Sequence, residues 1–516
     1  MAVLFRRARA NLHYGFRDMS IRAVLAIDQG TTGTTCLVVG EDGRVLGRAY
    51  SEFTQHFPRP GWVEHDASEI WRVTAQVART ALAAAQGGQV VAIGITNQRE
   101  TLVVWDRDTG DPVHRAIVWQ DRRTASICNE LKESGHEVEV RAKTGLMLDP
   151  YFSGTKLTWL LREYPELRKR AEAGELAAGT IDSWLIHNLT GGEVHATDPT
   201  NASRTLLYEL RDGGWDDRLL ALFEVPRAIL PEVRRSSGDF GVSVGDAIGI
   251  EVPVAGVAGD QQAALFGQGC WRAGLAKNTY GTGAFLLLHT GSDPVVSSHG
   301  LLTTVACDET GGPAFALEGS IFIAGAAVQW LRDGLRVIEA APESEVMARS
   351  VDGNDGVYFV PSFVGLGAPH WQAEARGTVV GLTRGTRREH LVRAALEAMA
   401  YATHDVLRAQ EADSGVAVTE LRVDGGASTN DFLMEFQAGV LGIPVRRPAM
   451  VDTTALGAAG LAGLASGVWR SAPDFLAAGA EPAVFRPRMM DAERQSLLSG
   501  WARAVRAAKA WAEDQG

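Results

Sequence analysis

The stretch Leu25–Thr35 reads LAIDQGTTGTT and brings one carboxylate and a cluster of hydroxyls to the end of an apolar run. The run predicts a buried strand, and the glycines after it predict a tight turn. Two interpretations fit these residues. Asp28 begins an ordinary turn, or the turn binds phosphate: backbone N–H groups beside Gly30 and Gly33 and the threonine hydroxyls approach a polyphosphate, and Asp28 holds Mg²⁺. Taken alone, the stretch does not choose between them.

Two later turns have the same design. Tyr280–Gly283 reads YGTG between two apolar strands, and Val423–Ser428 reads VDGGAS between a strand and a helix. A turn before a helix presents backbone N–H groups to a nucleotide. Each turn alone is typical of a strand end, but three in one chain favour a nucleotide site. The chain contains no GK dipeptide and no GxGxxG motif, so ATP would bind here without a Walker A or dinucleotide loop.

Bulk properties narrow the class of protein. A chain of 516 residues predicts two large domains, and its net charge of −12 argues against non-specific nucleic-acid binding. No apolar stretch is long enough for a membrane span. The four cysteines are far apart and lack metal-ligand spacing, which favours a reducing cytoplasm. The arginine-rich start lacks the apolar core of a secretory signal; we expect translation to begin at Met19, with residues 1–18 disordered or dispensable.

Strand and helix patterns alternate along the chain and indicate an α/β protein. Asp66 and Glu69 have capping-box spacing at the start of a helix whose buried face is Ile70, Val73, Val77 and Ala81. Val90–Thr96 predicts a buried parallel strand. Leu275–Thr290 predicts a second hairpin like the opening one. We place the boundary between two similar domains, residues 19–268 and 269–516, near Gly269.

Two stretches resemble the signature patterns of the FGGY family of carbohydrate kinases. They are YFSGTKLTWL, which begins at Tyr151, and a set of short blocks between Gly377 and Glu397. Further similar blocks run from about Arg22 nearly to the end, among them GITNQRE, IVWQ, AGDQQAALFGQ, NTYGTGAF, QWLRDGL and VDGGAS. The resemblance implies an actin-like ATPase fold, with two duplicated ribonuclease H-like domains around a central cleft. It is strongest to the members that phosphorylate glycerol, and therefore implies glycerol and ATP as substrates, with Mg²⁺.

The resemblance also implies roles for individual residues. Asp260 would accept the proton of the attacking hydroxyl and, with Asp28, bind Mg²⁺. The implied glycerol site consists of Arg99, Glu100, Trp119, Tyr151, Asp260, Gln261 and Phe285. The implied ATP site consists of Thr31, Thr32, Gly33, Thr282, Gly325, Gln329, Gly426 and Asn430.

Each of these residues also has an ordinary structural interpretation. Asp260 could cap the helix that follows it. Arg99 and Glu100 could form an exposed ion pair. The three aromatic residues of the glycerol set could each belong to a core. Their joint match to one family's site favours the functional interpretation.

The chain departs from the family pattern at Thr35, where related sequences commonly carry an arginine or lysine close to phosphate. A lost charge-assisted contact of roughly 1.5–3 kcal/mol would weaken ATP use about ten- to a hundredfold unless another basic residue compensates. The segment Gly245–Val252 also lacks the arginine of a fructose-bisphosphate loop, and Ser236–Gly241 lacks the histidine of phosphotransferase-regulated members. We expect neither form of regulation.

Two alternative functions stay open. One is a kinase of the same family for another polyol or a ketose, and the other is a weakly active ATP-binding sensor on the same fold. A base at position 260 distinguishes a kinase from the sensor, because a protein that only switches on ATP needs no base facing a second substrate. We also expect a homo-oligomer, either a dimer or a tetramer.

Overall fold

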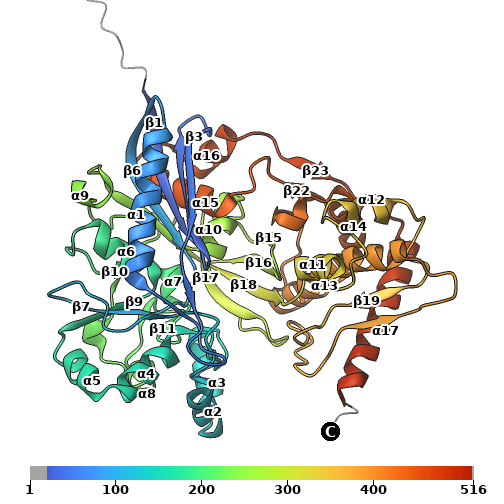
Figure 1. Cartoon of the computed structure of the whole chain (residues 1–516), viewed down its shortest axis with the longest axis horizontal. Coiled ribbons are helices and arrows are strands. Elements are labelled where there is room, and N and C mark those ends of the chain that lie inside the picture. The colour runs from blue at the N-terminus through green and yellow to red at the C-terminus, as the bar shows by residue number, and fades with distance from the viewer. Residues whose placement is uncertain (1–19, 514–516) are drawn as a thin grey trace, which may run out of the picture.

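The computed structural model describes residues 20–513 and consists of two halves, each built around one large sheet (Figure 1). The expected N-terminal extension, residues 1–18, lies outside the described residues. None of the described helices combines the length and the apolar character needed to cross a bilayer.

The first half contains a five-stranded sheet in the order β14-β6-β1-β2-β3. Strands β1, β2 and β3 form an antiparallel meander, β6 is added in parallel beside β1, and β14 is added in parallel beside β6. Val90–Thr96 lies within β6, so the expected parallel strand is confirmed. The strands are β1 (Ile21–Gln29), β2 (Gly33–Gly40), β3 (Val45–Glu52), β6 (Gly88–Asn97) and β14 (Val254–Gly259).

The second half repeats this design in a seven-stranded sheet of order β17-β18-β16-β15-β21-β22-β23. Here β18, β16 and β15 are antiparallel, and β21 and β22 continue in parallel. The expected second hairpin and the duplicated α/β architecture are therefore confirmed. The strands are β15 (Leu275–Tyr280), β16 (Ala284–Gly291), β17 (Leu302–Cys307), β18 (Pro313–Ile321), β21 (Glu420–Gly425), β22 (Val445–Arg447) and β23 (Ala483–Phe485).

Helices cover both sheets and position the site. In the first half these are α1 (Ala67–Ala84), α4 (Ser153–Glu163), α6 (Ile181–Leu189), α7 (Pro199–Ala202) and α10 (Asp260–Gly267). The C-terminal part of the sequence supplies α11 (Gly325–Asp333), α12 (Glu343–Arg349), α13 (Arg388–Ser414), α14 (Asp431–Leu441), α15 (Thr453–Ala465), α16 (Ala472–Ala478) and α17 (Asp491–Glu513).

Helix α1 forms where the sequence predicts it, but its capping box is only half made. Asp66 accepts hydrogen bonds from the backbone N–H groups of Ser68 and Glu69, at 2.9 and 3.1 Å. The Glu69 carboxylate accepts instead from the Thr54 hydroxyl at 3.2 Å. The predicted face, Ile70, Val73, Val77 and Ala81, is buried against the first sheet.

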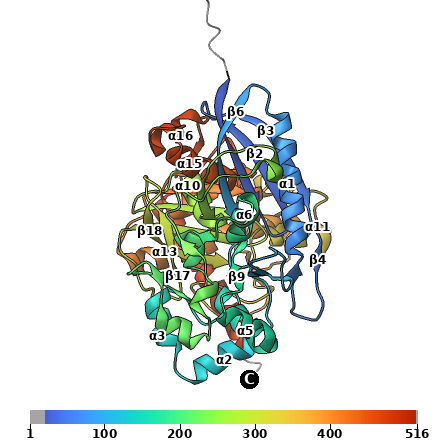
Figure 2. The same ribbon diagram turned by 90° about the vertical axis from the view of Figure 1, so that its left-hand side faces the viewer.

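Helix α15 belongs to the C-terminal half of the sequence but packs on the first sheet (Figures 1 and 2). Its residues share a core with β1, β2 and α10. Glycines permit close backbone contact there: a Cβ on Gly94 would overlap the backbone of Ala458, and one on Gly457 would overlap that of Ala263. The face of the first sheet opposite α1 is therefore covered by a helix distant in sequence.

Candidate active site

The opening turn between β1 and β2 is as tight as its glycines predict. The Gly30 N–H donates to the Gly33 carbonyl at 2.9 Å, and a side chain on Gly33 would collide with Tyr50. Thr32 is exposed, whereas the Thr31 hydroxyl accepts a hydrogen bond from the Trp119 indole at 2.9 Å. This contact joins the turn to one of the aromatic residues expected at glycerol.

Asp28 lies at the end of β1, directly opposite Thr35 in the antiparallel register. Burial, followed by the charges of Asp260 and Asp452, raises the pKa of Asp28 to about 7. Among residues 20–513 there is no cluster of three or more acidic, histidine or cysteine side chains fit to hold a metal. A pair of carboxylates suits Mg²⁺, which keeps several waters and binds phosphate oxygens besides. The negative charge shared by Asp28 and Asp260 is what such a cation would neutralise.

Arg99 and Glu100 follow strand β6 and are buried, so the exposed ion pair considered for them is wrong. The Arg99 guanidinium donates to both oxygens of Glu318 on β18, at 2.7 and 3.1 Å. Arg204, just after α7, bonds Glu100 at 2.6 Å and Glu318 at 3.1 Å. We call these four side chains the ionic ring: Arg99, Glu318, Arg204 and Glu100.

Burial acts differently on the two carboxylates of the ionic ring, because it raises the pKa of Glu100 despite the neighbouring Arg204 and Arg99. Burial by itself would raise the pKa of Glu318, but Arg204 and Arg99 hold it at about 2. Glu100 adopts a left-handed backbone conformation (φ 59°), which costs of order 1–3 kcal/mol in a residue with a side chain. Its carbonyl accepts a hydrogen bond from Ser153 at 3.0 Å. The surrounding contacts therefore hold Glu100 in an intrinsically unfavourable backbone conformation.

Asp260 is the first residue of α10 and projects from the end of β14. The helix cap is Gly259, whose N–H donates to the Thr200 hydroxyl at 2.8 Å. The Asp260 carboxylate accepts from the backbone N–H of Gln261 at 2.7 Å and lies 3.2 Å from Arg99 Nε. Its side chain is 33% exposed. Asp260 thus combines a fixed orientation with an open face, which a proton acceptor requires.

Lys277 on β15 contacts the neighbour of Asp260 from the opposite sheet. Its ammonium donates to the Gln261 side-chain oxygen and, at 2.8 Å, to the Thr279 hydroxyl. Because Oε1 of Gln261 is occupied, the amide NH₂ is left to donate elsewhere. Burial lowers the pKa of Lys277 to about 8, against the charges of Asp424, Asp260 and Glu318.

Aromatic side chains flank the ionic ring. The rings of Trp119 and Tyr151 meet edge to face at 5.5 Å, and the Arg204 guanidinium lies 5.7 Å from the Tyr151 ring. Phe285 on β16 pairs with Ser320, one position diagonal from Glu318 and on the same face of the second sheet. Trp119 and Tyr151 are therefore in direct contact beside the ionic ring, and Phe285 shares a sheet face with Glu318.

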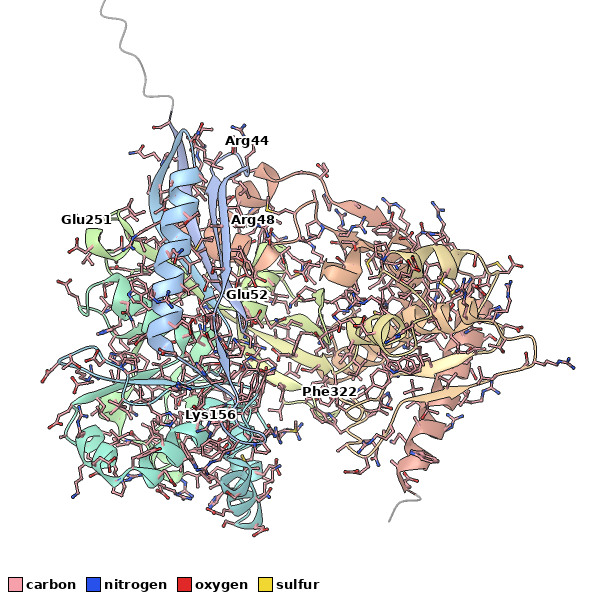
Figure 3. The ribbon with its side chains drawn as sticks, in the orientation of Figure 1. Arg44, Arg48, Glu52, Lys156, Glu251 and Phe322 are labelled. Atoms are coloured by element: carbon pink, nitrogen blue, oxygen red, sulfur yellow. The ribbon has the colours of Figure 1, made fainter. Side chains whose placement is uncertain are left out.

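The backbone around Tyr151 is held by Lys156, labelled in Figure 3. The buried ammonium of Lys156 donates to the carbonyls of Pro150, Tyr151 and Phe152, at 2.8, 2.5 and 3.2 Å. These carbonyls belong to the loop that enters α4. Lys156 therefore positions the loop that carries Tyr151.

A cavity of about 550 Å³ opens in the second half of the molecule. Its lining includes five of the residues expected at ATP: Thr282, Gly325, Gln329, Gly426 and Asn430. Backbone hydrogen bonds from Gly325 to Gly281 and from Ala324 to Thr282, at 3.0 and 2.8 Å, join the YGTG turn to α11. The VDGGAS turn forms the other wall. Two of the three turns therefore line this cavity, and the third is the opening turn at the end of the first sheet.

Arg204, Glu318 and Lys277 were missed by the sequence analysis. Two of them had a signal, because Lys277 stands in LAKNTY and Glu318 in PAFALEGSI, charged residues inside apolar strands. Such residues are rarely buried unless paired. Arg204 stands in an ordinary polar segment, and only its contacts distinguish it.

Comparisons with known proteins support this arrangement. The model of the FGGY family of carbohydrate kinases, N-terminal domain, matches residues 23–267, and that of the C-terminal domain matches residues 276–466. The glycerol kinase of Deinococcus radiodurans is 56% identical over 493 residues, which cover 95% of this chain and 98% of the relative. The glycerol kinase of Thermus thermophilus is 55% identical over 95% of this chain and 99% of the relative.

Solved structures show the same fold. The glycerol kinase of Plasmodium falciparum with ADP superposes with a TM-score of 0.90 at 35% identity, covering 95% of this chain and 98% of that one. The gluconate kinase of Lactobacillus acidophilus superposes with a TM-score of 0.85 at 21% identity, over 96% and 99% of the two chains, and supports the fold alone.

Proposed function

Because the chain belongs to the FGGY family of carbohydrate kinases, we propose that it catalyses the ATP-dependent phosphorylation of glycerol to sn-glycerol 3-phosphate. Asp260 is the general base, and Asp28 and Asp260 hold Mg²⁺. The first half carries the phosphate turn and most of the glycerol site, the second half carries Phe285 and the rest of the nucleotide site, and the domain boundary lies near Gly269.

The observation that carries the proposal is the position of Asp260. It contacts Arg99 of the ionic ring on one side and adjoins Gln261, which Lys277 holds from the other sheet. A base in this position lies beside the expected glycerol residues, and its charge also acts on Asp28 at the opening turn. The glycerol kinase relatives, about 55% identical over nearly the whole chain, support glycerol as the substrate.

The proposed reaction uses the side chains as follows. Glycerol is neutral, so fixed donors and acceptors must recognise its hydroxyls, and Arg99 and Glu100 supply one of each kind. The terminal hydroxyl oxygen attacks the γ-phosphorus of ATP, its proton passes to the Asp260 carboxylate, and the bond to the ADP oxygen breaks. Bound Mg²⁺ would neutralise charge on the phosphates. Positioning and charge stabilisation then account for most of the rate, as in other phosphoryl transfers.

The first experiment measures ADP release from MgATP with glycerol, xylulose, ribulose, gluconate or erythritol. Selective turnover of glycerol is expected from the natural protein. Asp260→Asn removes the proton acceptor and is expected to lower kcat by about 10²–10⁴-fold. The matched control is Glu251→Gln, an exposed carboxylate on the outer side of the first half (Figure 3), which should leave kcat unchanged.

Other outcomes would select the alternatives. Turnover of a different polyol or ketose in place of glycerol would reassign the substrate within the family. ATP binding without turnover of any of these compounds would favour a sensor. Full activity of Asp260→Asn would exclude Asp260 as the base. A cytoplasmic location and a dimeric or tetrameric assembly stay predictions, to be checked by fractionation and light scattering.

A further inference from the structure

The region around the opening turn is rich in carboxylates and short of available cations. Asp28 experiences the charges of Asp260 and Asp452, and a polyphosphate would add more negative charge. The cations beside Asp260 are already engaged: Arg99 binds Glu318, and Lys277 binds Gln261 and Thr279. Thr35, directly opposite Asp28, carries no charge.

Arg48 on the edge strand β3 lies on the same face of the sheet as Asp28 and Thr35. In the register, Thr35 is opposite Tyr50 and Leu37 is opposite Arg48, so Arg48 is the diagonal neighbour of Thr35. Diagonal neighbours on one face are about 7–8 Å apart, within reach of a long side chain. An arginine at position 48 can therefore cover the space that a residue at position 35 would otherwise fill.

Two contacts define the direction of the Arg48 side chain. A Cβ on the preceding residue, Gly47, would strike the Ala81 carbonyl of α1, and successive residues of a strand point to opposite faces. Arg48 therefore points away from α1, toward α15. Its Nη2 lies 3.2 Å from Asp452, at the start of α15, while 58% of its side chain is exposed. Figure 3 shows Arg48 and Glu52 along β3, with Arg44 just before the strand begins.

We propose that Arg48 binds the polyphosphate of the nucleoside triphosphate from β3, supplying the cation that position 35 lacks. The guanidinium has further N–H donors besides the one directed at Asp452, and its planar fork suits phosphate oxygens. The inference rests on the proposed function for its kinetic test. Its structural basis is the register of β1, β2 and β3 and the side-chain contact with Asp452.

The test compares Arg48→Ala with Arg44→Ala. Both variants remove one arginine and break one exposed arginine–aspartate pair, because Arg44 pairs with Asp42 at 2.7 Å. With saturating glycerol, Arg48→Ala is expected to lower kcat/KM for MgATP about ten- to a hundredfold, through loss of a charge-assisted contact. The KM for glycerol should change less than twofold. Arg44→Ala should alter neither value by more than twofold.

The decisive variant is the double substitution Arg48→Ala with Thr35→Arg. If Arg48 acts as a phosphate ligand, an arginine on the adjacent strand should raise kcat/KM for MgATP again. The increase over Arg48→Ala should be at least tenfold where the single substitution costs more than tenfold, and should restore most of the loss where it costs less. If Arg48 only ties β3 to α15, an arginine at position 35 restores nothing. Equal behaviour of Arg48→Ala and Arg44→Ala, or failure of the double variant to recover, would overturn the proposal.

Binding of a non-hydrolysable ATP analogue with Mg²⁺, measured by calorimetry, separates this inference from the proposed function. Weaker binding to Arg48→Ala than to Arg44→Ala supports the phosphate contact even if glycerol is not turned over. Equal binding to the two variants overturns the contact even if the natural protein proves to phosphorylate glycerol.

Discussion

At the scale of single residues, Asp28 is a carboxylate whose ionised form is unfavourable where it lies. A carboxylate at the end of a buried strand loses hydration, and Asp260 and Asp452 add negative charge beside it. Both effects favour the protonated form. The same position that makes Asp28 suitable for a divalent cation therefore makes its ionised form costly in the ligand-free protein.

The stability consequence has a defined sign. The pKa of Asp28 rises from an ordinary 3.8 to about 7 on folding, so folding takes up a proton between these two pH values. The free energy of unfolding is therefore reduced as pH rises through this window, and the whole cost is present above pH 7. Asp28→Asn removes this cost. We expect it to raise the melting temperature at pH 8, by an amount that shrinks toward pH 4.

The measurement is thermal unfolding of the ligand-free protein in the presence of a chelator, across that pH range. Asp352 is exposed, so its ionisation should affect stability little, and Asp352→Asn provides the control substitution. A stabilisation by Asp28→Asn that is equal at pH 4 and pH 8 would contradict the electrostatic explanation, because only an ionisation can make it pH-dependent.

At the scale of elements, α15 does more than complete the second half. It is rich in alanine and glycine, and its backbone approaches β6 and α10 so closely that side chains are excluded. Its start brings Asp452 and Thr453 to the site, where Thr453 bonds Asp424 and Asp452 pairs with Arg48. Small residues in this helix therefore allow its start, with Asp452 and Thr453, to lie close to the first sheet and α10.

Gly457→Ala tests this packing. Inside a helix the change is intrinsically favourable by about 1 kcal/mol, but here the added methyl would overlap the Ala263 carbonyl. We expect a net loss of about 1–3 kcal/mol in the free energy of unfolding, the usual range for overpacking, measured by urea denaturation. Gly214→Ala, where the added methyl meets open space, should be close to neutral. A stabilising Gly457→Ala would show that α15 can shift at little cost.

At the scale of the whole molecule, the ionic ring joins the two sheets. Arg99 and Glu100 extend from the first sheet and Glu318 belongs to the second, so the ring spans the contact between the halves. Removing one member of a buried ion pair leaves its partner uncompensated. The ring therefore couples the geometry expected at glycerol to the relative position of the two halves.

Glu318→Gln is expected to lower the free energy of unfolding by about 3–5 kcal/mol, the usual cost of breaking a buried pair. It should also raise the KM for glycerol more than the KM for ATP, because Arg99 loses its bidentate partner. The control is Glu309→Gln, which breaks an exposed pair with Arg272 of 3.0 Å and should cost at most about 1 kcal/mol. Equal increases in the two KM values would indicate general loosening and not a role at glycerol.

The sequence by itself determined the local part of this protein. Apolar periodicity located α1, β6 and the two hairpins, and the glycine and threonine pattern located the turns, because these properties depend on neighbouring residues. The family blocks also indicated the two halves and the residues expected to converge. Even locally, the Glu69 half of the capping box failed, because Thr54 offered a competing partner.

Only the tertiary structure decided which distant residues meet. Arg99 and Glu318 are 219 positions apart, and the residues next to either one in the sequence do not indicate that the two side chains meet. The same holds for Lys277 with Gln261, for Arg48 with Asp452, and for α15 on the first sheet. Burial made the Arg99–Glu100 pair part of a ring instead of a surface contact. Pairings of this kind arise when two sheets close on one another, so they depend on the packed chain and not on local pattern.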